Sequence, residues 1–244
     1  MDIVPFTHRL VPEHPQRRVI FSLLFASLVC VGMLGTRIIS SHGYRFTGFF
    51  GNLLLAWIPL LLSLAIPYLM ERSARPRAYG WSATVVWILF FPNCFYMVTD
   101  LVHMNKFGTD GIPRWHDLLM TMCFAFTGMF LGSLSLYQMQ HFVRKMKGRQ
   151  YGWFFAIGML VLGSYGIYLG RFLRLNSWDV VARPTRLARH IYYFAGPGGH
   201  SDVISFTITF FFFSLAAYAF FVSIAHLHAP HPHPLPQSTD ATER

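Results

Sequence analysis

Long apolar runs, each nearly free of charged residues, repeat along this chain. Six of them approach the ~20 residues that a helix needs to cross a bilayer. They are residues 18–40, 49–70, 80–102, 116–142, 151–173 and 203–226. The pattern predicts an all-α integral membrane protein, a bundle of about six transmembrane helices. Residues 18–226 would form this domain, between a cytoplasmic tail (1–17) and a disordered His/Pro-rich tail (227–244).

The composition supports a membrane protein and limits its partners. Only 12% of the residues are charged and 54% are hydrophobic, whereas soluble domains carry about 25% charged residues. The net charge of +10 is expected mainly in loops that touch anionic headgroups, so membrane lipids are the predicted partners. The apolar runs leave no soluble domain for nucleic-acid binding, which we therefore exclude. The three cysteines fall inside predicted spans and form neither a disulfide framework nor a zinc motif.

The first apolar run resembles a signal peptide only in its basic flank. It continues from residue 19 to about residue 40, longer than a typical apolar region of 7–15 residues, and it lacks an A-x-A exit. We therefore expect it to be retained as the first helix.

The distribution of Lys and Arg predicts that both termini are cytoplasmic. With the N-terminus inside, eleven basic residues fall on the inner side and nine on the outer side, and the short loops favour this orientation. The long fifth loop is the exception, because it holds five arginines on the outer side. Its mixture of arginine and aromatic residues is typical of a segment lying in the membrane interface.

Glycine pairs at a spacing of four occur in two neighbouring spans. Gly128 and Gly132 lie in the fourth span, and Gly166 and Gly170 lie in the fifth. Small residues at this spacing let membrane helices approach closely. The pattern predicts that these two helices pack against each other through their glycines.

A polar stripe enters the third span from its outer end. After Pro92, the residues Asn93, Tyr96, Asp100 and His103 fall within roughly an 80° arc of an α-helix. Such a stripe is costly in a membrane unless it faces a partner or water. The topology brings it to the same membrane face as the start of the fourth span and the end of the fifth. The candidate polar site is Asn93, Tyr96, Asp100, His103, Asp117, Arg171, Arg174, Asn176 and Asp179.

Of three interpretations of this site, the first is our functional hypothesis and the others are its alternatives. Arginines pair bidentately with phosphate oxygens, so the site could bind an anionic lipid or a lipid-linked phosphate. Asp100, His103 or Asp117 would then act as acid, base or metal ligand. Mixed oxygen and imidazole ligands could instead hold a divalent metal. The candidate metal ligands are Asp100, His103, His116 and Asp117.

In the third interpretation, the charges only pair with one another. Asp100 and Asp179 would neutralise Arg171 and Arg174 near the bilayer, and the protein would be a non-enzymatic membrane scaffold or assembly protein. A small-solute transporter is a further alternative, disfavoured because no matching pair of broken helices suggests inverted repeats. The sequence leaves open whether the protein is an enzyme, and it identifies neither a cofactor nor a catalytic residue.

Two other features carry weaker functional hypotheses. The C-terminal sequence HLHAPHPHPLP could hold a transition metal, but its prolines favour a disordered tail. Cys94 could form a thiol site with His103 and Arg171, but its depth in the third span argues against a reactive thiol.

Three separated motifs resemble one family. They are Asn52-Leu-Leu-Leu-Ala-Trp57-Ile-Pro59, then Phe91-Pro92-Asn93-Cys-Phe-Tyr96-Met-Val-Thr99-Asp100, then Gly170-Arg171-Phe-Leu-Arg174-Leu-Asn176-Ser177-Trp178-Asp179. They are similar, over roughly residues 20–225, to the bacterial multi-pass membrane proteins catalogued as domain of unknown function 1361. Family members more usually have Ala and Pro where this chain has Cys94 and Phe95. The resemblance implies a protein of the bacterial cytoplasmic membrane and supplies no activity.

Overall fold

The computed structural model describes residues 14–41, 43, 46–72, 76–109, 111–173, 185 and 201–227, which form helices joined by short turns. The helices are α1 (His14–Ser41), α2 (Gly48–Arg72), α3 (Pro76–Phe90), α4 (Pro92–Tyr96), the 3₁₀ helix η1 (Met97–Lys106), α5 (Arg114–Lys147), α6 (Arg149–Phe172) and α9 (Ser201–Leu227). The predicted all-α class is confirmed.

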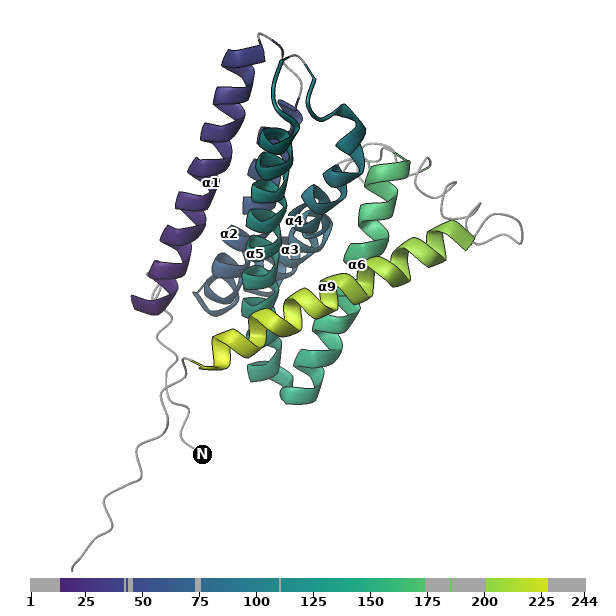
Figure 1. Ribbon diagram of the computed structural model, residues 1–244. Coiled ribbons are helices and arrows are strands. Elements are labelled where there is room, and N and C mark those ends of the chain that lie inside the picture. The colour runs from purple at the N-terminus through teal and green to yellow at the C-terminus, as the bar shows by residue number, and fades with distance from the viewer. Residues whose placement is uncertain are drawn as a thin grey trace, which may run out of the picture.

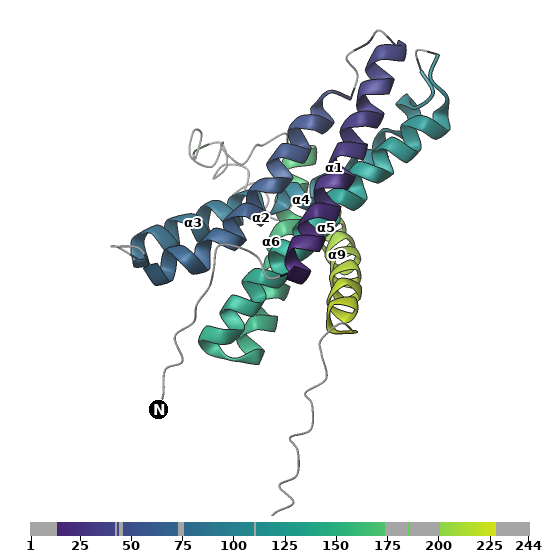
Figure 2. The ribbon, with the colours of Figure 1, turned by 90° about the vertical axis from the view of Figure 1, so that its left-hand side faces the viewer.

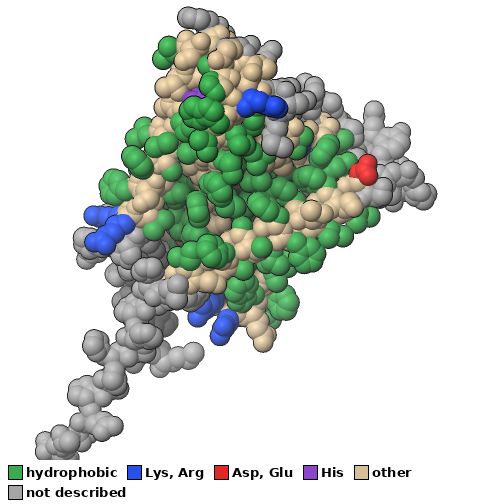
Figure 3. All heavy atoms as spheres, in the orientation of Figure 1, with side chains coloured by type: hydrophobic (Ala, Val, Ile, Leu, Met, Phe, Trp, Pro, Cys, Tyr) green, Lys and Arg blue, Asp and Glu red, His purple; other side chains and the backbone are tan. Residues whose placement is uncertain are grey.

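The described chain contains six stretches that are long and apolar enough to cross a membrane. They are Arg17–Ser41, Gly48–Met70, Ala78–Val102, Arg114–Lys147, Arg149–Phe172 and Asp202–Ala225. Each coincides with a predicted span, with ends that differ by a few residues. Large apolar side chains cover the outside of the bundle (Figure 3), and Phe25, Phe154 and Phe220 are about 70% exposed. Such a surface is expected to face lipid, so the multi-pass prediction is confirmed.

Helix α5 is the centre of the bundle. It runs between α1 and α6, and α9 crosses α5 and α6 obliquely (Figures 1 and 2). In its most apolar stretch 61% of the residues are buried, against 39% or less in the other spans. Its buried hydroxyl groups find partners, as where Trp87 Nε1 of α3 donates to Ser135 Oγ over 2.8 Å. The Trp87 ring stacks on Phe91, which lies between α3 and α4, and on Phe155 of α6.

The third span is broken at Pro92. Proline has no amide hydrogen to donate, and α3 ends at Phe90 before α4 begins at Pro92. From Met97 the chain tightens into the 3₁₀ helix η1, which has about three residues per turn. The prediction that the polar stripe lies on one face of a continuous α-helix is therefore wrong. Tyr96 and Asp100 lie on two different kinds of helix.

Three of the four paired glycines, Gly128, Gly132 and Gly166, lie against α4 from two sides. A Cβ on Gly128 would lie 2.4 Å from the Cys94 carbonyl oxygen, and one on Gly132 would lie 2.7 Å from Cys94 Cβ. On α6, a Cβ on Gly166 would lie 2.8 Å from Pro92 Cγ. Helices α5 and α6 do contact each other as predicted, but the prediction that these glycines form that contact is wrong. They make room for the short helix α4.

Two cysteines test the packing of α1 against α5. The Sγ atoms of Cys30 on α1 and Cys123 on α5 lie 3.4 Å apart as free thiols. We expect oxidation with copper phenanthroline in detergent to join them, because little movement is needed to form the bond. Intact-mass measurement should show the loss of two hydrogens, and Cys123→Ser should abolish it. Failure of the wild type to form this link while Cys94 forms one with another thiol would contradict this packing.

Several sequence predictions fall on residues that are not described. The interfacial segment predicted between the fifth and sixth spans lies in residues 174–200, of which only Thr185 is described. The predicted tails also lie largely outside the described residues. The domain boundaries and the orientation in the membrane remain predictions.

Candidate functional site

Arg171 at the C-terminal end of α6 is held by the broken third span. Its Nη1 donates to Asp100 Oδ1 over 2.8 Å, and its Nη2 donates to the Thr99 carbonyl oxygen over 2.6 Å. The Tyr96 hydroxyl lies 3.5 Å from Nη1. The guanidinium carbon lies over the Tyr96 ring, 5.4 Å from its centroid, which is a cation–π contact. We call Tyr96, Thr99, Asp100 and Arg171 the Arg171 clamp. It ties the end of α6 to α4 and η1.

The Arg171 clamp is largely removed from water. The side chain of Arg171 is 12% exposed and that of Asp100 is 6% exposed. The Asn52 side chain of α2 also approaches the Asp100 carboxylate. A carboxylate at this depth is stable only beside a counter-charge. The ion pair therefore explains how both charges are tolerated near the end of the bundle.

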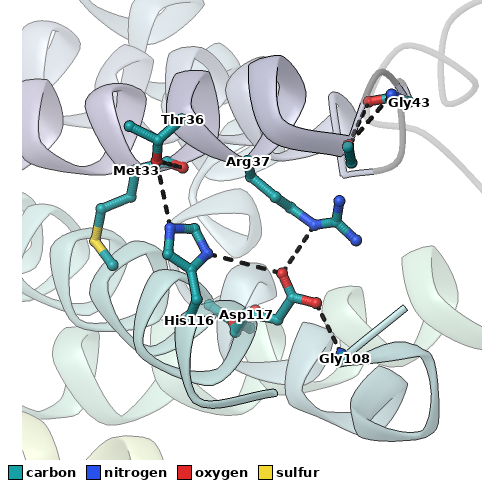
Figure 4. Close-up of polar contacts among 9 residues, drawn as sticks. Met33, Thr36, Arg37, Gly43, Gly108, His116 and Asp117 are labelled. Atoms are coloured by element: carbon teal, nitrogen blue, oxygen red, sulfur yellow. Dashed lines mark hydrogen bonds and ion pairs between the residues drawn. The ribbon is translucent and has the colours of Figure 1, made fainter. Parts of the chain in front are cut away.

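A second ion pair joins α1 to α5 (Figure 4). Arg37 Nε donates to Asp117 Oδ1 over 2.8 Å, and the two side chains are 1% and 0% exposed. The other carboxylate oxygen, Oδ2, accepts a hydrogen bond of 3.0 Å from the Gly108 amide. The Phe46 ring lies 5.1 Å from the centre of the guanidinium. This pair thus connects α1, α5 and the turn that follows η1.

His116 lies at the edge of the second pair. Its Nε2 is 3.3 Å from Thr36 Oγ1 on α1, and its Nδ1 is 3.9 Å from Asp117 Oδ1. Figure 4 shows the ring between Thr36 and the carboxylate. We call Arg37, His116 and Asp117 the Arg37 group. It adds a second contact between α1 and α5.

The predicted polar site is thus divided by its described contacts. Tyr96, Asp100 and Arg171 meet in the Arg171 clamp, whereas Asp117 belongs to the Arg37 group. Asn93 lies apart, and its side-chain amide donates to the Phe90 carbonyl oxygen over 3.0 Å. His103 lies in η1, but its side chain is outside the described residues. Arg174, Asn176 and Asp179 also lie outside them.

Arg37 is the residue that the sequence analysis missed. It is the one charged residue between positions 19 and 40, so its need for a partner is readable from the sequence. The identity of that partner is not, because Asp117 lies 80 positions further along the chain. Asn52, beside Asp100, was missed for the same reason.

The other two chemical hypotheses have different outcomes. Among the described side chains, no group of three His, Cys, Asp or Glu residues lies close enough to share a metal ion. His103 is not among them, so the predicted metal set remains untested. Cys94 is 0% exposed, and its thiol donates to the Ala56 carbonyl oxygen over 3.3 Å. This contact packs α4 against α2 and leaves the thiol no access to a reactant.

Comparison with known proteins identifies a family. No curated protein and no solved structure matches the chain. A family model described as "Protein of unknown function (DUF1361)" matches residues 52–217. The matched region runs from α2 into α9 and includes Asp100, Asp117 and Arg171, while Arg37 precedes it. Because the match covers more than half of a chain with six membrane-spanning helices, this membrane protein belongs to the DUF1361 family.

Proposed function

We propose that this protein is a non-enzymatic membrane scaffold or assembly protein, in which the Arg171 clamp holds the helices together. The proposal rests on the hydrogen bonds that the Arg171 guanidinium makes. Its two Nη atoms donate to the Asp100 carboxylate, the Thr99 carbonyl oxygen and the Tyr96 hydroxyl. These contacts occupy the guanidinium, and the buried carboxylate neutralises its charge. We therefore infer that Arg171 stabilises the contact of α6 with α4 and η1.

Binding of a lipid phosphate at this place is less well supported by the same contacts. A phosphate could approach Arg171 bidentately only by displacing Asp100 or the Thr99 carbonyl. Displacing Asp100 would leave a nearly buried carboxylate without its counter-charge, which is unfavourable. An anionic lipid or lipid-linked phosphate at the predicted outer cluster therefore remains the competing hypothesis.

A double-mutant cycle on Asp100 and Arg171 tests the proposal. Asp100→Leu and Arg171→Met should each lower the free energy of unfolding by about 2 kcal/mol, because each leaves one charge unpaired. The loss is expected to be smaller than for a fully buried pair, since Arg171 reaches water in part. The double variant should recover most of it, because no charge remains to be solvated. The measurement is an SDS titration in detergent micelles followed by circular dichroism.

Native mass spectrometry of the same variants separates the two hypotheses. A structural clamp predicts the same bound lipids for the wild type and the stable double variant. Loss of a bound anionic lipid from a double variant that is still folded would refute the structural role and support phosphate binding. Independent effects that simply add in the cycle would also refute it.

Transport is a second candidate function, favoured by one observation. The third span is broken at Pro92, with Asp100 buried after the break. Broken helices with buried charges are typical of transporter binding sites. The absence of a second broken span among the described helices makes this candidate the weaker one. A flux assay in proteoliposomes, with Asp100→Asn as the comparison, would detect it.

A further inference from the structure

A small pocket lined by both polar and apolar side chains lies at the other end of the bundle from both ion pairs. It opens where α5 turns into α6 beside the second half of α9, and its volume is about 60 Å³. A single buried water requires roughly 10–15 Å³, so the pocket has room for a group of several atoms. Its lining includes Gln140, His141, Arg144, Arg149 and Trp153. We call this the α5–α6 pocket.

The turn between α5 and α6 brings two arginines to this pocket. Gly148 ends α5 with a φ of +105°, a conformation that side-chain-bearing residues rarely adopt. A Cβ on Gly152 would lie 3.1 Å from both Arg144 Cβ and the Gln140 carbonyl oxygen, so α6 approaches α5 closely here. Arg144 and Arg149 therefore lie on either side of one tight turn. Figure 3 shows Lys and Arg side chains gathered at this end, below the apolar surface.

Among the described residues, no acid matches the charge at the pocket. Both arginines are exposed, and neither guanidinium has an ion-pair partner among the described residues. The sequence contains no Asp or Glu between Asp117 and Asp179. The first turn of α6, where the helix dipole favours a negative charge, also lacks an acid. This differs from the opposite end, where Asp100 and Asp117 neutralise Arg171 and Arg37.

One buried polar side chain at the pocket is fixed in orientation. Gln140 is 7% exposed, and its Oε1 accepts a hydrogen bond from the Tyr218 hydroxyl of α9. The oxygen is thereby occupied, and the amide nitrogen is the group left to donate. Trp153 packs edge-on against Tyr218, with ring centroids 6.5 Å apart. The pocket thus combines two cationic groups with an oriented neutral donor.

We propose that the α5–α6 pocket binds the phosphate of an anionic phospholipid. Arg144 and Arg149 supply the positive charge, and Gln140 supplies a directed hydrogen bond to a phosphate oxygen. A lipid is a better occupant than a free phosphate because the pocket lies at the end of two membrane-spanning helices. Trp153 and Val222, which belong to the pocket lining, give an acyl chain an apolar surface to contact.

Lipid titration of the full-length protein tests the proposal. Native mass spectrometry in a neutral detergent would compare added phosphatidylglycerol with phosphatidylcholine, which carries no net charge. The wild type should bind phosphatidylglycerol more tightly. Arg144→Gln and Arg149→Gln should each weaken that binding about fivefold, and the double variant more than tenfold, because each basic side chain near a membrane surface contributes about that factor.

Arg114→Gln is the matched control. Arg114 is an exposed arginine at the opposite end of α5, so the substitution removes the same charge away from the pocket. It should leave phosphatidylglycerol binding unchanged. All variants should unfold at the wild-type SDS concentration, because these arginines are exposed.

Three results would overturn the proposal. One is a double variant that binds phosphatidylglycerol as tightly as the wild type. Another is equal affinity of the wild type for phosphatidylcholine. The third is binding of inorganic phosphate or glycerol phosphate as tightly as the lipid, which would show that the occupant is a soluble anion. Weak binding of both soluble anions beside tight, arginine-dependent lipid binding would support it.

Discussion

Arg37→Met is expected to lower the free energy of unfolding by about 3–5 kcal/mol, the largest effect predicted for this protein. The substitution keeps the length of the apolar stem but leaves Asp117, which is 0% exposed, without its cation. Removing one member of a buried ion pair leaves the other charge in a medium of low polarity, and a cost of this size is typical. The hydrogen bond from the Gly108 amide does not supply the positive charge that Arg37 provides to the Asp117 carboxylate.

The stability of three variants would test this expectation by SDS titration followed by circular dichroism. Arg37→Met together with Asp117→Leu should recover much of the loss, since neither charge remains. Arg114→Gln removes an exposed arginine three positions from Asp117 and should change stability by less than about 0.5 kcal/mol. If Arg37→Met unfolds no more easily than Arg114→Gln, the buried ion pair does not stabilise the fold.

Gly128→Val is expected to destabilise the protein by about 3 kcal/mol. Even the first carbon of the new side chain would lie 2.4 Å from the Cys94 carbonyl oxygen and from Met97 Cε. The methionine can move, but the carbonyl belongs to the backbone of α4. To relieve the overlap, α4 must shift away from α5, and overpacking of a close-packed contact typically costs 1–3 kcal/mol or more.

Gly158→Val on α6 is the matched control. A Cβ at Gly158 would meet nothing within 4 Å, and valine is a better helix former than glycine. Its stability in the same SDS titration should equal or slightly exceed that of the wild type. Equal losses at Gly128 and Gly158 would mean that the loss comes from the helix itself, and the close approach of α4 to α5 would be refuted.

A shift of α4 should also reach the Arg171 clamp. Cys94 lies in the same short helix as Tyr96, and η1 with Thr99 and Asp100 follows directly. The glycines on α5 and α6 therefore determine where the acceptors for Arg171 lie. Changes at Gly128 and at Asp100 are expected to be non-additive, because both act through the position of α4.

The sequence alone determined the secondary structure and the class of protein. In lipid, a run of about 20 apolar residues must satisfy its backbone hydrogen bonds internally, and an α-helix does so within a single segment. The six spans and the family resemblance were accordingly readable from residue order, whereas the break at Pro92 was not. The need of each intramembrane charge for a partner was also readable.

Only the tertiary structure decided which partners meet. Asp117 lies beside Arg37 because α1 packs on the start of α5. Gly128, Gly132 and Gly166 face α4 because the third span lies between α5 and α6. A stripe calculated at 100° per residue could not foresee the 3₁₀ turn that places Tyr96 and Asp100 around Arg171. These contacts join residues 71–80 positions apart. Local spacing describes one helix at a time, whereas the rotation and approach of neighbouring helices arise from packing the whole bundle.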